Sequence, residues 1–208
     1  MPKLSTTTTP TATLAGLMLA AAGSFAAADN QTGATSAYST LNWDENCTVT
    51  GEPTADAPEE NWIQLRCDGY GGLPVHVADD NGRMSLSYGH QSEKTRHWNS
   101  FAGFNEVHDT IEWRLHDTGG ELRPFATIHR WLVGSAGTES ERRAVLVVST
   151  VANRAAGKSC DVGYVDATLT PDANTLAREI ADTLAPNFAC GRDRAQWHGN
   201  SDAGTPER

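Results

Sequence analysis

Apolar and polar residues alternate along the middle of the chain with the period of two that is typical of β-strands. The alternation is clearest in residues 109–152, in the strings DTIEWRL, PFATIHRWLVG and AVLVVSTVA. In the first string, Ile111 and Trp113 alternate with Glu112 and Arg114. Polar links separate the three strings, so we predict three consecutive antiparallel strands at the centre of a sheet.

The third of these strings has a different pattern. Its residues Val145–Val148 are continuously apolar and mostly β-branched. Such a run is typical of a strand that is covered on both faces. We therefore expect a helix to cover one face of this strand.

Two hairpins are predicted earlier in the chain. The strings CTVT and WIQLRC form the first, and LPVHVAD and RMSLSYG form the second. Asn81 and Gly82 join the second pair, and Asn-Gly is a strong signal for a tight hairpin turn. Residues 90–107 follow without a regular pattern and are interpreted as a loop or a short helix.

A helix is predicted late in the chain, in TPDANTLAREIADTLAP. Thr170 is the expected cap, Pro171 fits the first helical position, and Pro186 ends the helix. The fold class is therefore α+β, with an antiparallel sheet of about seven or eight strands and one C-terminal helix packed on it. One apolar stripe would face the sheet, formed by Ala173, Leu176, Ala177, Ile180 and Leu184.

The beginning of the chain has the layout of a cleaved secretory signal peptide, residues 1–28. Its apolar run, Leu14–Ala22, is far shorter than the ~20 residues that span a bilayer. Residues 29–37 are polar and are predicted to be a flexible lead-in. Residues 38–190 would form a single β-rich domain, and residues 191–208 a disordered tail.

The composition limits the class of partner. The formal net charge is -10, from 16 Lys and Arg against 26 Asp and Glu. A chain of this charge repels nucleic acid and anionic lipid, whereas a cationic protein would be attracted. With the signal peptide, this indicates a periplasmic or secreted protein without a membrane span.

Four cysteines are present, an even number that suggests two disulfides in an exported chain. Three pairings are possible, and we favour Cys47 with Cys67 and Cys160 with Cys190, because each pair flanks one local unit. In the chain-entropy account, each bond would contribute about 3–4 kcal/mol. The absence of a CxxC string argues against a metal or redox role.

The strings CDGYGGLPV, SLSYG, TIEWRL, PFATIHRW and SCDVGYVDA resemble a group of uncharacterised small secreted proteins of Gram-negative bacteria. The likeness spans roughly residues 38–190. It implies export and paired cysteines, and it carries no activity, cofactor or ligand to transfer.

Candidate chemistry is sparse. No HExxH, GxSxG or Walker string occurs, and nothing in the sequence points to a cofactor or a metal. The best polar set is Glu112, Arg114, His129 and Arg130, which lie on two strands expected to be neighbours. It would be a recognition patch or an acid–base pair, and the more common explanation is cross-strand charge pairing on a solvated face.

These residues lead to three functional hypotheses. The first is a non-catalytic module that binds a periplasmic or extracellular macromolecule and, in one version, inhibits it. The second is a hydrolase-type enzyme that uses Glu112 and His129. The third is a carbohydrate-binding module, for which Trp98 and Trp197 are the best surface aromatics.

Overall fold

The computed structural model describes residues 33–57, 59–92, 96, 98–135, 138–153, 157–201 and 208. The expected signal peptide lies outside the described residues. No described helix is long and apolar enough to cross a membrane.

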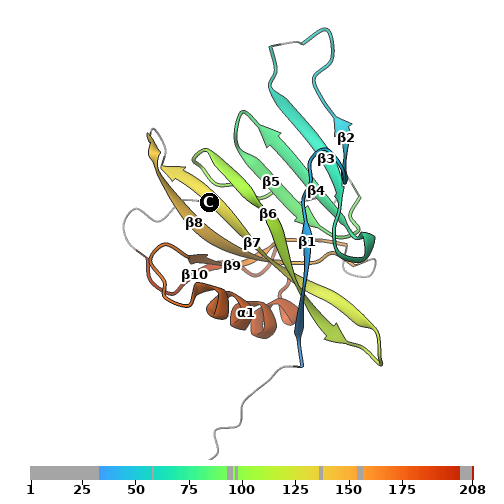
Figure 1. Ribbon diagram of the computed structural model, residues 1–208, viewed down its shortest axis with the longest axis vertical. Helices are drawn as coiled ribbons and strands as arrows, with labels where there is room; N and C mark the ends of the chain where they lie inside the picture. Colours follow the sequence, from blue (N-terminus) through green and yellow to red (C-terminus); the bar gives the residue numbers. More distant parts are fainter. Residues whose placement is uncertain are drawn as a thin grey trace, which may run out of the picture. The chain divides into compact units, whose positions relative to one another are not determined.

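The described residues form ten strands in two sheets (Figure 1). Sheet A has the order β1-β6-β7-β8-β9-β10, and sheet B has the order β2-β3-β4-β5. The strands of sheet A are β1 (Thr35–Thr40), β6 (Asn105–Asp117), β7 (Leu122–Ser135), β8 (Thr138–Thr150), β9 (Asp161–Asp166) and β10 (Gln196–His198). Those of sheet B are β2 (Cys47–Gly51), β3 (Trp62–Asp68), β4 (Pro74–Asp80) and β5 (Met84–Tyr88).

The prediction of a single sheet with seven or eight strands is therefore wrong. The chain leaves sheet B after β5, and β6 pairs with β1 instead of continuing from β5. β1 begins at Thr35, inside the segment that we expected to be a flexible lead-in. Alternation along a strand reports which faces are buried, but it does not report which strand is the neighbour.

The three central strands are confirmed. β6, β7 and β8 are consecutive and antiparallel, and they lie in the middle of sheet A. In β8, Val145 and Val147 face the core between the two sheets, whereas Leu146 and Val148 face the helix. The continuous apolar run of this strand is therefore buried on both faces, as predicted.

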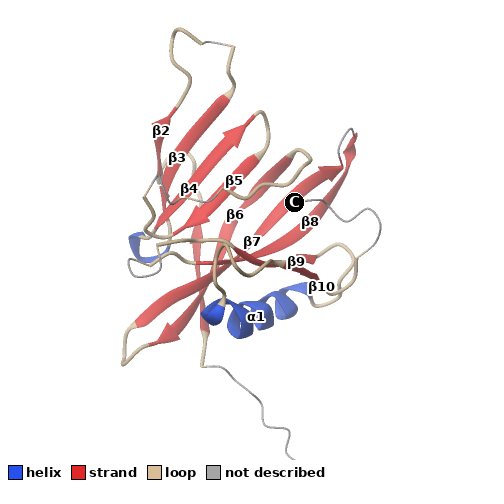
Figure 2. Cartoon of the chain, turned by 180° about the vertical axis from the view of Figure 1, so that it is seen from behind, coloured by secondary structure: helices blue, strands red, loops and turns tan. Residues whose placement is uncertain are grey.

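Helix α1 (Ala173–Leu184) packs on the outer face of sheet A, along β9, β8 and β7 (Figure 2). Gly163 of β9 permits this contact, because a Cβ at this position would lie 3.1 Å from the side chain of Ile180. The buried stripe comprises Ala173, Ala177, Ile180 and Ala181, while Leu184 is exposed. A short 3-10 helix, η2 (Ala185–Asn187), follows directly.

The helix begins differently from the prediction. Asp172 occupies the N-cap position with a positive φ of 54°, and its side chain makes no capping hydrogen bond. Thr170 instead donates its hydroxyl to the carbonyl oxygen of Asn200. The segment around Asn200 was expected to be a disordered tail, but it contains β10, which pairs in parallel with β9.

Both disulfides are present with the favoured pairing, Cys47–Cys67 and Cys160–Cys190. The first joins residues that lie opposite each other in the β2–β3 hairpin. The second ties the residue before β9 to the segment that follows α1 and η2. A second short 3-10 helix, η1 (Tyr70–Gly72), connects β3 to β4.

Candidate functional site

The polar set that the sequence predicted is divided between the two faces of sheet A. Glu112 and Arg114 point toward α1, where they meet Arg178 and Asp182. His129 lies opposite Ile111 in the β6–β7 pairing and contacts Tyr88 in the core between the sheets. Glu112 and His129 therefore do not share a cleft, and an acid–base pair made of these two residues is excluded.

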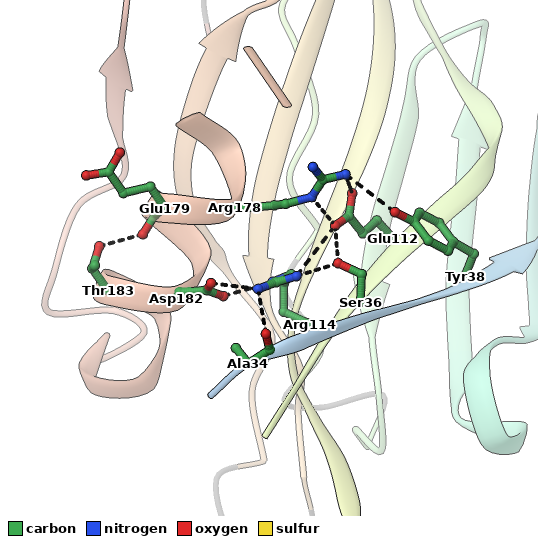
Figure 3. Close-up of polar contacts among 9 residues, drawn as sticks. All are labelled: Ala34, Ser36, Tyr38, Glu112, Arg114, Arg178, Glu179, Asp182 and Thr183. Carbon is green, nitrogen blue, oxygen red and sulfur yellow. Dashed lines mark hydrogen bonds and ion pairs between the residues drawn. The ribbon is translucent and has the colours of Figure 1, made fainter. Parts of the chain in front are cut away.

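An ionic network that we call the clamp is formed by Glu112, Arg114, Arg178 and Asp182 (Figure 3). Arg178 is partly exposed, and the other three side chains are largely buried. Arg114 donates from Nε and Nη2 to the two carboxylate oxygens of Asp182, at 2.8 and 2.6 Å. Arg178 donates from Nε and Nη2 to Glu112, at 2.6 and 3.1 Å. Ser36 of β1 bridges the two pairs, because it donates to Glu112 and accepts from Arg114.

The geometry of the clamp is that of a structural connection. Its hydrogen bonds join β1, β6 and α1, and each of its four charged groups is matched by the opposite charge. The hydrogen bond to Glu112 raises the pKa of Arg178, so Arg178 stays cationic across the physiological range. A bidentate arginine–carboxylate pair with low exposure is costly to break.

His129 is fully buried and uncharged. Its Nδ1 lies 2.9 Å from the hydroxyl oxygen of Tyr88, and its Nε2 lies 2.6 Å from the carbonyl oxygen of His108. Burial lowers its pKa to about 4. Because both ring nitrogens already have protein partners, His129 has a structural role in the core.

The other two predicted binding residues lie apart from the clamp and from each other. Arg130 donates to the amide oxygen of Asn174 on α1, at 3.4 Å. Trp98 is half-buried, and the guanidinium of Arg96 lies 5.2 Å from the centre of its ring. Trp197 packs on Tyr164, with ring centres 5.2 Å apart. These positions do not form a common aromatic platform.

A different group of side chains surrounds a cation at the edge of the core between the sheets. The guanidinium carbon of Arg208 lies 4.2 Å from the ring centre of Phe101, 4.8 Å from that of Tyr164 and 5.7 Å from that of Trp131. All three rings are buried. We call Phe101, Trp131, Tyr164 and the adjacent Asp161 the cage.

Asp161 supplies the negative charge of the cage. Its carboxylate accepts hydrogen bonds from the hydroxyl groups of Ser149, at 2.9 Å, and Tyr164, at 3.1 Å. Arg208 donates to the same carboxylate. A buried carboxylate below aromatic rings is the arrangement that binds organic cations, because the ring faces and the carboxylate both attract positive charge.

The pKa shifts of Arg208 and Tyr164 are consistent with a site that holds a cation. Burial lowers the pKa of Arg208 to about 9, which leaves the side chain cationic at neutral pH. Burial also raises the pKa of Tyr164, so its hydroxyl remains a proton donor to Asp161. The indole nitrogen of Trp131 is buried without a hydrogen-bond partner among the described residues.

The sequence did not reveal the cage because its members come from distant segments. Phe101 precedes β6, Trp131 lies on β7, and Asp161 and Tyr164 lie on β9. Asp161 and Tyr164 are three residues apart, so their side chains would face opposite sides of a regular strand. A register shift between β8 and β9, with Val162 as the extra residue, places both on the same face.

The cage thus has the chemistry to hold a cation, and the clamp joins α1 to sheet A. No group of three or more His, Cys, Asp or Glu side chains among the described residues could hold a metal ion. Comparisons of the chain with family models, with curated proteins and with solved structures found no match.

Proposed function

We propose that this chain is an exported, non-catalytic domain that binds a cationic side chain of a partner macromolecule in the cage. The observation that carries the proposal is the guanidinium of Arg208, which lies among three aromatic rings and on the carboxylate of Asp161. In this proposal Arg208 is an intramolecular occupant, and a guanidinium from the partner takes the same place.

The chemistry of the cage favours binding over catalysis. Asp161 already accepts hydrogen bonds from Ser149, Tyr164 and Arg208, so both oxygens of its carboxylate are engaged with donors. The rings are core residues, and their positions are set by packing before any ligand arrives. A preorganised site of this kind reduces the entropy cost of binding.

Charge and compartment support the same function. The net charge of -10 would steer a cationic partner toward the chain and speed up association. Two disulfides are consistent with an oxidising compartment such as the periplasm or the extracellular space. Inhibition of the partner would be a consequence of binding if the captured side chain is essential to it.

The proposal can be tested by calorimetry with a blocked Gly-Arg-Gly peptide and its citrulline counterpart, which has nearly the same shape and no charge. Cation–π contacts of about 0.5–2 kcal/mol and charged hydrogen bonds of about 1.5–3 kcal/mol predict a dissociation constant near the millimolar range. The arginine peptide should bind and the citrulline peptide should not.

Two variants and one matched control make the test specific. Asp161→Asn should weaken binding at least tenfold. Phe101→Leu removes the ring nearest to the guanidinium of Arg208 and should weaken binding several-fold. Asp166→Asn is the control, because Asp166 is also a buried aspartate on β9 paired with an arginine, Arg143, at 3.0 Å. Equal binding of the citrulline peptide, or equal losses in the Asp161 and Asp166 variants, would contradict the proposal.

A further inference from the structure

The outer face of sheet B carries a buried polar residue where a solvated one is expected. Val75 and Val77 of β4 face the core, so His76 between them points outward. Its side chain is nevertheless only 7 % exposed. Arg66 of β3 and Ser87 of β5 lie on either side of it in the strand pairing.

Three buried polar atoms in this region have no hydrogen-bond partner among the described residues. They are Nε2 of His76, Oγ of Ser87 and Nε2 of Gln91. The amide oxygen of Gln91 accepts from the backbone nitrogen of Ser159, at 3.2 Å, which fixes the orientation of this side chain. Each unsatisfied buried group costs about 1–3 kcal/mol, so atoms of this kind that line one cleft, as those of His76 and Gln91 do, indicate a site that is completed by a ligand.

His76 and Gln91 line the same cleft, which has a volume of about 560 Å³. This is large enough for a small organic molecule, since ligand pockets usually measure about 300–1,000 Å³. No acidic side chain is among the described lining residues, which are Arg66, Pro74, His76, His90, Gln91, Ser92 and Gly157.

The charges around His76 are predominantly positive. Burial lowers its pKa to about 4, and Arg96, Arg66 and His90 act in the same direction, while a backbone hydrogen bond with Gly89 opposes them. Arg66 pairs with Asp68 at 3.2 Å, and both side chains are substantially exposed. An exposed pair of this kind contributes little, so Arg66 remains available to an anionic ligand.

We propose that this cleft is a second binding site, distinct from the cage, and that it binds the carboxyl group of a small organic acid. The two oxygens of a carboxyl group can accept hydrogen bonds from the guanidinium of Arg66 and the amide of Gln91. One proton is taken up from solvent on binding, and it is shared between the carboxyl group and Nε2 of His76. The lining residues therefore provide hydrogen-bond partners for the carboxyl group. In turn, the carboxyl group provides partners for Nε2 of His76 and Nε2 of Gln91.

The test uses nuclear magnetic resonance of the full chain with labelled histidine and glutamine side chains. Acetate is the probe, and acetamide and inorganic phosphate are compared with it at constant ionic strength in chloride. Acetate should produce saturable shifts of the His76 ring nitrogens and the Gln91 side-chain amide, with a millimolar midpoint. Acetamide and phosphate should produce much smaller shifts.

The matched variants are Arg66→Gln and Arg192→Gln. Both arginines form exposed ion pairs with a nearby aspartate, but only Arg66 lines the cleft. Arg66→Gln should weaken acetate binding at least fivefold, and Arg192→Gln should leave it unchanged. The proposal is overturned if acetate gives no saturable shift, if phosphate binds equally well, or if Arg66→Gln has no effect, which would indicate ordered water or an adventitious ion only.

Discussion

The clamp and the cage lie on opposite faces of sheet A, and each pairs an arginine with a buried carboxylate. In the clamp the arginines belong to β6 and α1, and their partners belong to the same two elements. In the cage only the carboxylate and the rings belong to the sheet or its adjoining loop, whereas Arg208 comes from outside every strand and helix.

The position of each arginine, inside or outside a strand or helix, suggests a different role for the clamp and for the cage. The side chain of Arg114 is only 7 % exposed, so this arginine cannot leave its carboxylate unless the fold opens. An arginine outside these elements can be replaced by another cation while the rings and Asp161 stay in place. The clamp should therefore determine stability, and the cage should determine binding.

Removal of an arginine from the clamp should have the largest effect on stability. Arg114→Met would leave Asp182 buried without its bidentate partner, which should lower the free energy of unfolding by about 3–5 kcal/mol. Urea unfolding measures the loss. The control is Arg123→Met, because the Arg123–Glu121 pair is exposed and worth about 0–1 kcal/mol.

If Arg114→Met lowers the free energy of unfolding by less than about 1 kcal/mol, the clamp contributes no more than an exposed surface ion pair. The folded fraction of this variant should still bind the arginine peptide with native affinity, because the cage lies on the other face of the sheet. A parallel loss of affinity would show that the two faces are coupled.

Acid should weaken the core on the cage side. The pKa of His129 is about 4 in the fold, below its ordinary value of 6.5, so the unfolded chain binds more protons between these values. The contribution of neutral His129 is complete above pH 6.5 and falls as the pH drops toward 4, by at most about 3 kcal/mol. His76 acts with the same sign.

The measurement is urea unfolding at several pH values between 7 and 4, for the native chain and for His129→Gln. The variant should be less stable at pH 7 and should lose less stability on acidification. His116→Gln is the control, since His116 stacks on Phe125, at 3.8 Å between ring centres, outside the core between the sheets. Identical pH profiles for the native chain and His129→Gln would refute the assignment.

Gly89, which follows β5 of sheet B, forms a bridge with Ala152, which follows β8 of sheet A. Its φ is +90°, and a Cβ there would lie only 2.1 Å from the carbonyl oxygen of Ala152. Gly89→Ala should therefore cost about 2–3 kcal/mol, from backbone strain and overpacking together. Gly119→Ala is the matched control, because Gly119 also has a positive φ but has no atom within 4 Å of the added Cβ.

Thermal unfolding of the two glycine variants separates the two contributions. The Gly119 variant should show the backbone strain alone, about 1 kcal/mol, and the Gly89 variant should lose more. Equal losses would mean that the contact with Ala152 adjusts without cost.

The sequence predicted those features that depend on local pattern. The alternation around Trp113, the β-branched run of β8 and the Asn81-Gly82 turn all specify their elements through residues close in the chain, and the structure confirms them. The disulfides followed from the same logic, because each closes a local unit.

The features that escaped prediction depend on contacts between distant segments. The division into two sheets follows from the pairing of β1 with β6, some 70 residues apart, and no local pattern specifies it. The clamp needs α1 to meet β6, and the cage needs a bulge at Val162. Of the predicted site residues, Glu112 and Arg114 do lie together, but their partners Arg178 and Asp182 were not foreseen.

The most direct test of the cage as an exchangeable cation site compares the affinity of the native chain and of Arg208→Ala for the same Gly-Arg-Gly peptide. An intramolecular occupant competes at an effective concentration of roughly millimolar, similar to the expected dissociation constant, so its removal should tighten peptide binding about twofold or more. Weaker binding by Arg208→Ala, or no binding by either chain, would contradict the account and leave Arg208 as a fixed part of the fold.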